Sequence, residues 1–148
     1  MEENAASRRR RTLSAALARL VPPGAGPGAV EAGADGYVAR WLDGGAPISR
    51  FLAEGLDLLD RRALETCGAG FAALEPTRQD EVLRAVESDP APPGAGFLRQ
   101  FVLLALEGSF CHPARGGNRD GAGWRFAGLG VAPLDPDPSP DPSRCRAS

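Results

Sequence analysis

The stretch GFLRQFVLLALEG, residues 96–108, decides the fold of this chain. Its apolar residues recur at helical spacing and cover more than half of the circumference of the predicted helix. A helix that is apolar over so much of its surface is stable in water only when other elements cover it. We therefore predict that this segment is the central helix of an α-helical bundle.

The residues that precede this segment supply the helices that would surround it. Apolar residues at helical spacing predict further helices over residues 12–21, 29–42, 49–74 and 77–88. We expect Tyr37 and Trp41 to face inward, and a capping box at Thr77 to begin the last of these helices. No segment alternates apolar and polar residues for long enough to form a strand. The predicted fold class is all-α, a compact bundle of about five helices with a Gly-rich irregular C-terminal loop.

The two ends of the chain differ in composition from this helical part. Residues 1–11 are polar and rich in arginine, and we expect them to form a disordered arm. Residues 132–148 alternate proline with acidic or small residues, and we expect a disordered tail there. The sequence therefore predicts a single helical domain over residues 12–131, flanked by these two tails.

The arginine run at positions 8–11 has a second interpretation. SRRRRTL, residues 7–13, has the look of a twin-arginine export signal. The apolar run that should follow it is short, is interrupted by Arg19 and ends at Pro22, and no cleavage site follows. A solvated arm is therefore favoured, which predicts a cytoplasmic protein. Export to the periplasm together with a partner is the alternative.

Composition excludes several classes of function. The chain has 148 residues and a formal net charge of −2, so it lacks the positive charge that attracts nucleic acid or anionic membranes. All 17 basic residues are arginines, which leaves no lysine for a Schiff base or a phosphate loop. The single histidine, His112, excludes metal sites that need two imidazoles. No apolar run is long enough to insert into a membrane.

The cysteines leave two interpretations open. Cys67, Cys111 and Cys145 show neither a C-x-x-C pair nor the spacing of a zinc site. They permit one internal disulfide, and the remaining thiol could bond a partner chain in an oxidising compartment. The simpler interpretation is favoured: Cys67 is a small buried helix residue and Cys145 an incidental residue of the tail.

The segment FCHPARGGNRDGAGW, residues 110–124, contains the residues that suggest chemistry. Its glycines do not form a phosphate loop, because the lysine, the preceding strand and the G-x-G-x-x-G pattern are all missing. It lacks the acidic ligands of a calcium loop. Cys111 and His112, with Asp120 as an orienting acid, give no arrangement that would stabilise an oxyanion. We therefore expect no catalytic, cofactor-binding or metal-binding residue in this chain.

An ordered loop is what suits these residues physically. The glycines at 116, 117, 121 and 123 permit positive φ angles and close approach of the backbone. Asn118 and Asp120 can hydrogen-bond to nearby backbone groups, and Trp124 can attach the loop to the bundle. Either the loop only closes the bundle, or it presents Arg115 and Arg119 to another protein. Composition alone does not separate these two interpretations.

The run from residue 97 to 128, above all EGSFCHPARGGNRDGAGWRFAGL, resembles the subunit 3 (gamma subunit) family of gluconate 2-dehydrogenase. The family hallmark is a Phe, a Pro, Gly-Gly-Asn, Gly-Trp and a further Gly. These correspond to Phe110, Pro113, Gly116-Gly117-Asn118, Gly123-Trp124 and Gly128. The resemblance covers about residues 12–131, with GLDLLD at 55–60 and FAALEPTRQDEVL at 71–83 among the upstream matches.

The resemblance implies a helper role for this chain. In such complexes a large glucose–methanol–choline-type subunit holds the FAD and acts on the substrate, and a cytochrome c subunit can accept the electrons. The small subunit supports the maturation, stability or export of the large one and binds no cofactor itself. Many relatives have a complete twin-arginine signal, which this chain has at most in part.

The alternatives are a stand-alone helical interaction module and, from another class, a small enzyme that uses His112 or Cys111. Under the helper interpretation, the residues expected to bind the partner or to define the loop are Phe110, His112, Pro113, Arg115, Gly116, Gly117, Asn118, Arg119, Asp120, Gly123 and Trp124.

Overall fold

The computed structural model describes residues 4–129 of the chain. Within that range the elements are α1 (Ala5–Leu20), α2 (Ala34–Asp43), α3 (Pro47–Cys67), the 3₁₀ turn η1 (Phe71–Ala73), α4 (Pro76–Glu87), α5 (Gly94–Phe110), the 3₁₀ turns η2 (Pro113–Arg115) and η3 (Arg119–Gly121), and α6 (Ala122–Phe126). No strand occurs in the described residues, so the predicted all-α fold is confirmed. The predicted tail over 132–148 lies outside them.

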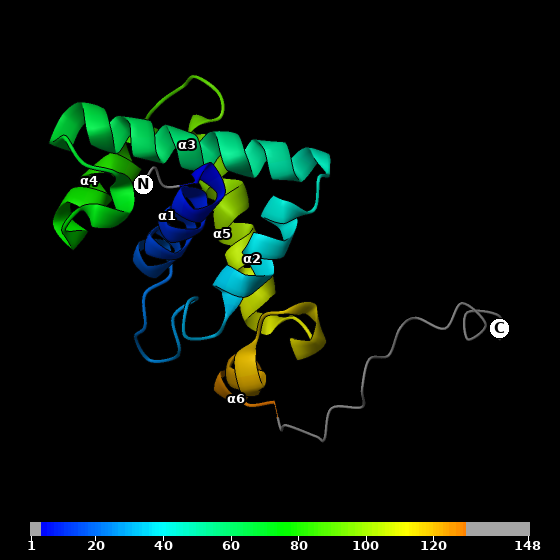
Figure 1. Ribbon diagram of the computed structural model, residues 1–148. Coiled ribbons are helices and arrows are strands. Elements are labelled where there is room, and N and C mark those ends of the chain that lie inside the picture. The colour runs from blue at the N-terminus through cyan, green and yellow to red at the C-terminus, as the bar shows by residue number, and fades with distance from the viewer. Residues whose placement is uncertain (1–3, 130–148) are drawn as a thin grey trace.

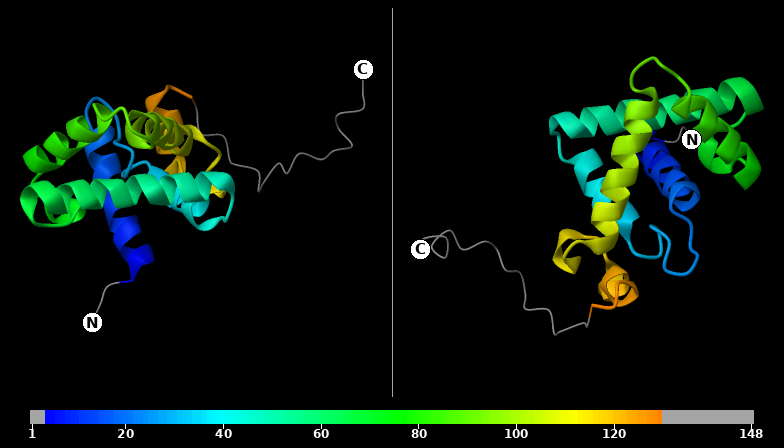
Figure 2. Two further views of the ribbon diagram at one scale, coloured as in Figure 1. Left: turned by 90° about the horizontal axis from the view of Figure 1, so that it is seen from above. Right: turned by 180° about the vertical axis from the view of Figure 1, so that it is seen from behind.

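The long helix α3 lies across one end of α1, α2 and α5, and α4 packs near its C-terminal end (Figure 1). Seen from behind, α1, α2 and α5 extend to the same side of α3, and α6 lies at the opposite end of α5; the view from above shows α1 crossing beneath α3 (Figure 2). Within residues 4–129, no helix combines the length and the hydropathy that crossing a membrane requires.

α5 is the central helix that the sequence predicts, since it contacts α1, α2, α3, α4 and α6. Phe97 and Phe101 are fully buried and stack with their ring centroids 5.2 Å apart. The ring of Phe97 fits against α3 only because residue 55 is glycine, since a methyl group there would lie 2.0 Å from that ring. A small residue in α3 therefore makes room for the largest side chains of the core.

The prediction that residues 1–11 form a disordered arm is wrong from residue 5 onward. α1 begins at Ala5, where the side chain of Asn4 caps the helix by accepting a hydrogen bond from the Ala6 amide at 3.0 Å. Arg9 forms two hydrogen bonds to Asp57 of α3, at 2.9 and 2.6 Å, and Arg10 pairs with Asp43 of α2. These ion pairs with distant segments neutralise an arginine run that would repel itself if it stood alone.

Glycines in the left-handed conformation shorten two of the predicted helices. Gly33, with φ +79°, separates the turns of residues 29–33 from α2, which begins at Ala34 and not at residue 29. Gly68, with φ +73°, ends α3 at Cys67, so the predicted continuation to residue 74 is wrong.

Two further predictions from spacing are wrong. Helical spacing predicts that Trp41 faces inward, but 41% of its surface is exposed. Thr77 does not cap α4, because the helix already begins at Pro76 and Thr77 lies exposed in its first turn. Proline at the first helical position has a φ angle suited to a helix start and needs no hydrogen-bond acceptor.

Candidate functional site

The candidate site is the segment that follows α5, residues 111–126, called here the glycine loop. It contains η2, η3 and α6 and packs against the C-terminal end of α5 (Figure 1). The predicted irregular loop thus contains two short 3₁₀ turns and one short α-helix. None of these three elements has the apolar periodicity from which a helix can be predicted. Hydrogen bonds to side chains and carbonyl groups elsewhere in the chain hold them in place instead.

Asn118 is the centre of the glycine loop. Its side chain is fully buried, and its φ of 44° places it in the left-handed region, which Asn tolerates better than most residues. The amide Nδ2 donates to the Cys111 carbonyl at 2.9 Å, and Oδ1 accepts from the Gly123 amide at 2.8 Å. Its backbone amide donates to the Gly108 carbonyl at 2.6 Å. One residue therefore joins the end of α5, the start of the loop and α6.

Two of the glycines are needed because backbone groups approach them closely. A methyl group on Gly117 would lie 2.1 Å from the carbonyl oxygen of Gly108, and one on Gly123 would lie 1.9 Å from that of Ser109. Gly116 is required for a different reason, its φ of +93°. The predicted use of these glycines, positive φ and close backbone approach, agrees with the structure.

Trp124 attaches the loop to α5. Its indole Nε1 donates to the Phe110 carbonyl at 2.7 Å, and the ring of His112 packs against it edge to face at 5.9 Å between centroids. Trp124 is half-buried, so part of the ring remains available to another molecule. Nδ1 of His112 accepts a hydrogen bond from the Ala114 amide at 3.2 Å, which holds the turn that begins at Pro113.

The geometry does not favour covalent chemistry at Cys111. Burial raises the pKa of the Cys111 thiol above its ordinary value, which disfavours the nucleophilic thiolate. The thiol lies 3.6 Å from the Gly108 carbonyl, and within residues 4–129 no hydrogen bond joins His112 to Asp120. Cys67 and Cys111 are both free thiols, and Cys145 lies outside the described residues. In the part of the chain that the structure describes, no three His, Cys, Asp or Glu side chains form a group that could hold a metal ion.

Several residues of the predicted set face solvent. Arg115, Arg119 and Asp120 are exposed, and the Arg119 amide also joins the loop to the Ala32 carbonyl at 2.7 Å. Phe110, the last residue of α5, is 42% exposed. The loop therefore has a buried half that fixes its shape and an exposed half that can meet another protein.

An apolar strip on α5 leads to this exposed half. Leu103, Leu106 and Phe110 are 50%, 42% and 42% exposed, and their spacing puts them on one face of the helix. The sequence shows α5 as apolar over most of its surface, but the periodicity does not reveal which of these residues remain uncovered. We call Leu103, Leu106 and Phe110 the α5 strip.

Among the hollows in the surface of residues 4–129, two are similar in size. One, of about 550 Å³, is bounded by α2 and the glycine loop, and its lining is Tyr37, Arg40, Trp41, Gly44, Ala46, His112, Ala114 and Arg115. The spacing of residues along the chain does not predict that α2 contributes to this hollow. The adjacent Arg40 and Trp41, both residue types enriched at interfaces, were the available signal.

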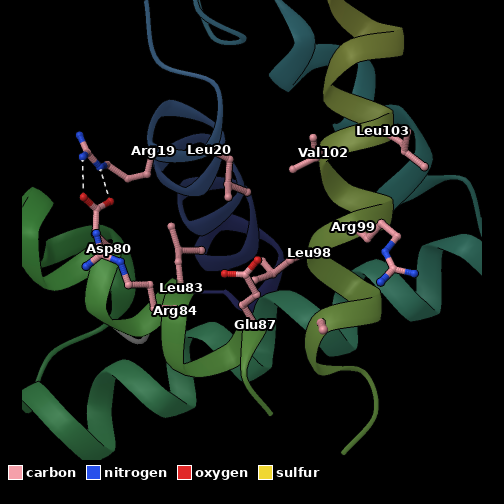
Figure 3. A pocket seen from close by; sticks show the side chains of 11 residues that line it. Arg19, Leu20, Asp80, Leu83, Arg84, Glu87, Leu98, Arg99, Val102 and Leu103 are labelled. Atoms are coloured by element: carbon pink, nitrogen blue, oxygen red, sulfur yellow. Dashed lines mark hydrogen bonds and ion pairs between the residues drawn. The ribbon is translucent and has the colours of Figure 1, made fainter. Parts of the chain in front are cut away.

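The other hollow, of about 610 Å³, lies between α1, α4 and α5. Figure 3 shows Arg19 bound to Asp80 on one side of it, Arg99 on the other, and Leu83 and Leu98 between them. Both hydrogen bonds of the Arg19–Asp80 pair are 2.8 Å long. Arg84 and Glu87 also line this hollow, so both signs of charge are present in it.

Comparison with known protein families identifies this chain's family. The family model of gluconate 2-dehydrogenase subunit 3 matches residues 7–130, a range that includes the arginine run of α1 and the whole glycine loop. No curated protein and no solved structure matches the chain.

Proposed function

Because the chain belongs to the gluconate 2-dehydrogenase subunit 3 family, we propose that it is a non-catalytic small subunit of a flavin-dependent dehydrogenase. It binds a large subunit of the glucose–methanol–choline type, which holds the FAD and oxidises an alcohol or sugar. Its role is to support the maturation, stability or export of that subunit. A cytochrome c subunit is proposed as a further member of the complex.

The observation that carries this proposal is the position of the α5 strip beside a rigid loop. Exposed apolar side chains that gather in one place mark surfaces that other molecules cover. The strip ends at Phe110, whose carbonyl group is bound by Trp124 of the glycine loop at 2.7 Å. Aromatic residues, which are enriched at the centre of interfaces, therefore stand where the helix and the loop meet.

The rigidity of the loop supports the same role. The Asn118 hydrogen bonds and the close backbone approaches at Gly117 and Gly123 fix its conformation before any partner arrives. A surface that is already ordered loses little conformational entropy on binding, which improves affinity.

The proposal is tested by co-expressing the chain with a glucose–methanol–choline-type flavoprotein encoded beside it and purifying through a tag on the small chain. We expect the two chains to co-purify. Leu106→Asp should weaken the complex, because it places a charge in the apolar strip. The matched control is Leu64→Asp, since Leu64 is also an exposed helix residue, 55% accessible, but lies on α3.

Failure of the unmodified chains to co-purify would contradict the proposed function. If the chains co-purify and Leu106→Asp and Leu64→Asp weaken the complex equally, the proposed partner stands, but the α5 strip is not part of the interface. Turnover of an alcohol by the purified small chain alone would favour the alternative, an enzyme using His112 or Cys111.

We also propose that the arginine run at positions 8–11 serves the fold and that the protein acts in the cytoplasm. Arg9 and Arg10 are bound to Asp57 and Asp43 of the same chain, which supports a structural use of this run. Cell fractionation with a C-terminal tag tests this. Recovery in the periplasm that depends on these arginines would contradict it.

A further inference from the structure

We propose that the hollow between α2 and the glycine loop receives an acidic segment of the large subunit, with a carboxylate between its two arginines. This inference rests on the proposed function and names the chemistry of the partner segment that would fit. The hollow, of about 550 Å³, is bounded on one side by Arg40 and Trp41 and on the other by His112 and Arg115.

Charge is the first observation that supports the proposal. Elsewhere in residues 4–129, seven arginines are bound to carboxylates of this chain, namely Arg8, Arg9, Arg10, Arg19, Arg50, Arg62 and Arg78. Other exposed arginines of these residues, such as Arg84, Arg99 and Arg119, form no ion pair with a carboxylate. Among the described residues, Arg40 and Arg115 form no such pair, and no acidic residue lines this hollow. Two guanidinium groups that share a concave surface favour a carboxylate supplied from outside.

The second observation is that Arg40 is already held in place. Its Nη1 donates to the Ala114 carbonyl at 3.3 Å, and its guanidinium packs over Gly116, where a methyl group would lie 2.8 Å from Nε. Only one of its donor groups is used in this hydrogen bond. The remaining N–H groups of the planar guanidinium can therefore bind a carboxylate from a fixed position.

The third observation is the aromatic wall. Trp41 is 41% exposed and packs edge to face on Tyr37 with centroids 6.5 Å apart. The Tyr37 hydroxyl donates to Glu107 at 3.1 Å, and burial raises the pKa of Tyr37, so this hydroxyl keeps its proton and the ring stays oriented. Trp, Tyr and Arg are the residue types that contribute most to binding energy at interfaces. The segment that fits has an apolar residue for Trp41 beside its carboxylate.

The other hollow, between α1, α4 and α5, is lined by acidic residues as well as by arginines. Asp80 and Glu87 line it together with its arginines, and Arg19 is already bound to Asp80 (Figure 3). An acidic segment would gain less there, because it would meet carboxylates as well as guanidinium groups. The hollow beside the glycine loop is therefore the one that selects for an acidic segment.

The test uses the co-expressed complex of the two full chains and measures affinity at several salt concentrations. Arg115→Glu should weaken binding about tenfold or more, with the largest effect at low salt, because a repulsive charge replaces an attractive one. Arg115→Lys should retain most of the affinity. The matched control is Arg99→Glu, which makes the same charge change on an exposed arginine of the other hollow.

A second measurement identifies the segment of the large subunit that lies in the hollow. A photo-crosslinking amino acid at position 41 should attach to a peptide of the large subunit that contains Asp or Glu. Thermal melting of each variant alone, expected to match that of the unmodified chain, shows that the fold is intact.

Each result has a separate meaning. If the unmodified chains do not bind each other, the proposed function and this inference both fail. If they bind and Arg115→Glu weakens the complex no more than Arg99→Glu does, the inference fails while the function stands. A crosslink from position 41 to a peptide without acidic residues would also overturn it.

Discussion

At the scale of single residues, Asn118 and Asp60 show how this small chain uses buried polar groups. Asn118 is fully buried, and both ends of its amide have partners. Asp60 is 4% exposed, and its carboxylate accepts hydrogen bonds from the Thr12 hydroxyl and the Phe71 amide, all at 3.0 Å. Asp60 joins α3 to α1, 48 positions away, and to η1, whereas Asn118 holds the turns within the glycine loop.

Two replacements of Asn118 should show how much each of its two side-chain hydrogen bonds contributes to stability. Asn118→Ala should lower the free energy of unfolding by about 2–4 kcal/mol, since it leaves buried backbone groups without partners. Asn118→Asp keeps an oxygen acceptor for the Gly123 amide but places a second acceptor beside the Cys111 carbonyl. Chemical denaturation checks both variants. Stability within about 0.5 kcal/mol of the unmodified chain for Asn118→Ala would contradict this account.

At the scale of elements, α3 contains a glycine that core packing requires, although glycine is unfavourable inside a helix. Gly55 lies inside a helix of 21 residues, where alanine would ordinarily be preferred. The ring of Phe97 occupies the space that a methyl group would need. Phe97 also packs edge to face on Phe51, at 6.3 Å between centroids, so the ring cannot easily move away.

Gly55→Ala should therefore destabilise the protein, although it raises helix propensity. The expected loss is about 1–3 kcal/mol, the usual cost of overfilling a packed core. Thermal denaturation measures the change. Gly96→Ala in α5 is the matched control, because nothing lies within 4 Å of a methyl group there, and it should be neutral or stabilising. A stabilising effect of Gly55→Ala would show that the core can rearrange around Phe97.

Helix pairing through ion pairs should make stability depend on pH. The hydrogen bond from Arg9 is the main cause that lowers the pKa of Asp57 below its ordinary value of 3.8, and Arg19 has the same effect on Asp80. As the pH falls, the unfolded chain binds protons before the folded chain does. The free energy of unfolding should therefore be constant near neutral pH and fall below about pH 5.

A variant that removes one pair tests the cause of this dependence. Arg9→Gln should be less stable than the unmodified chain at neutral pH, and the difference should narrow as the pH falls and Asp57 becomes protonated in both the unfolded and the folded state. Urea denaturation at a series of pH values measures this. A difference that stays constant over the whole range would assign the effect of Arg9 to packing and not to its charge.

At the scale of the whole molecule, the structure divides into a core that supports the fold and a surface that is prepared for contact. α5 takes part in both, since Phe97 and Phe101 lie in the core whereas Leu103 and Leu106 are exposed. The glycine loop extends this surface from the end of α5 and meets α2 at the hollow.

Hydrogen exchange should show that the loop is ordered before a partner binds. The amides of Asn118, Arg119 and Gly123 donate to Gly108, Ala32 and Asn118, and they should exchange far more slowly than those of an unstructured segment. Mass spectrometry or NMR on the free chain gives these rates. Exchange at the rate of an unfolded peptide would mean that the loop becomes ordered only on binding.

The sequence by itself determined the all-α class, the central position of α5 and the use of glycines 116, 117 and 123, because helical periodicity and glycine geometry are local properties. Only the tertiary structure decided that residues 5–11 are helical, that Trp41 is exposed and that α2 and the glycine loop enclose a hollow. Arg9 meets Asp57 across 48 positions, and α2 meets the loop through residues such as Arg40 and Ala114, 74 positions apart. Contacts at such separations depend on how the helices pack together, and local spacing does not encode that packing.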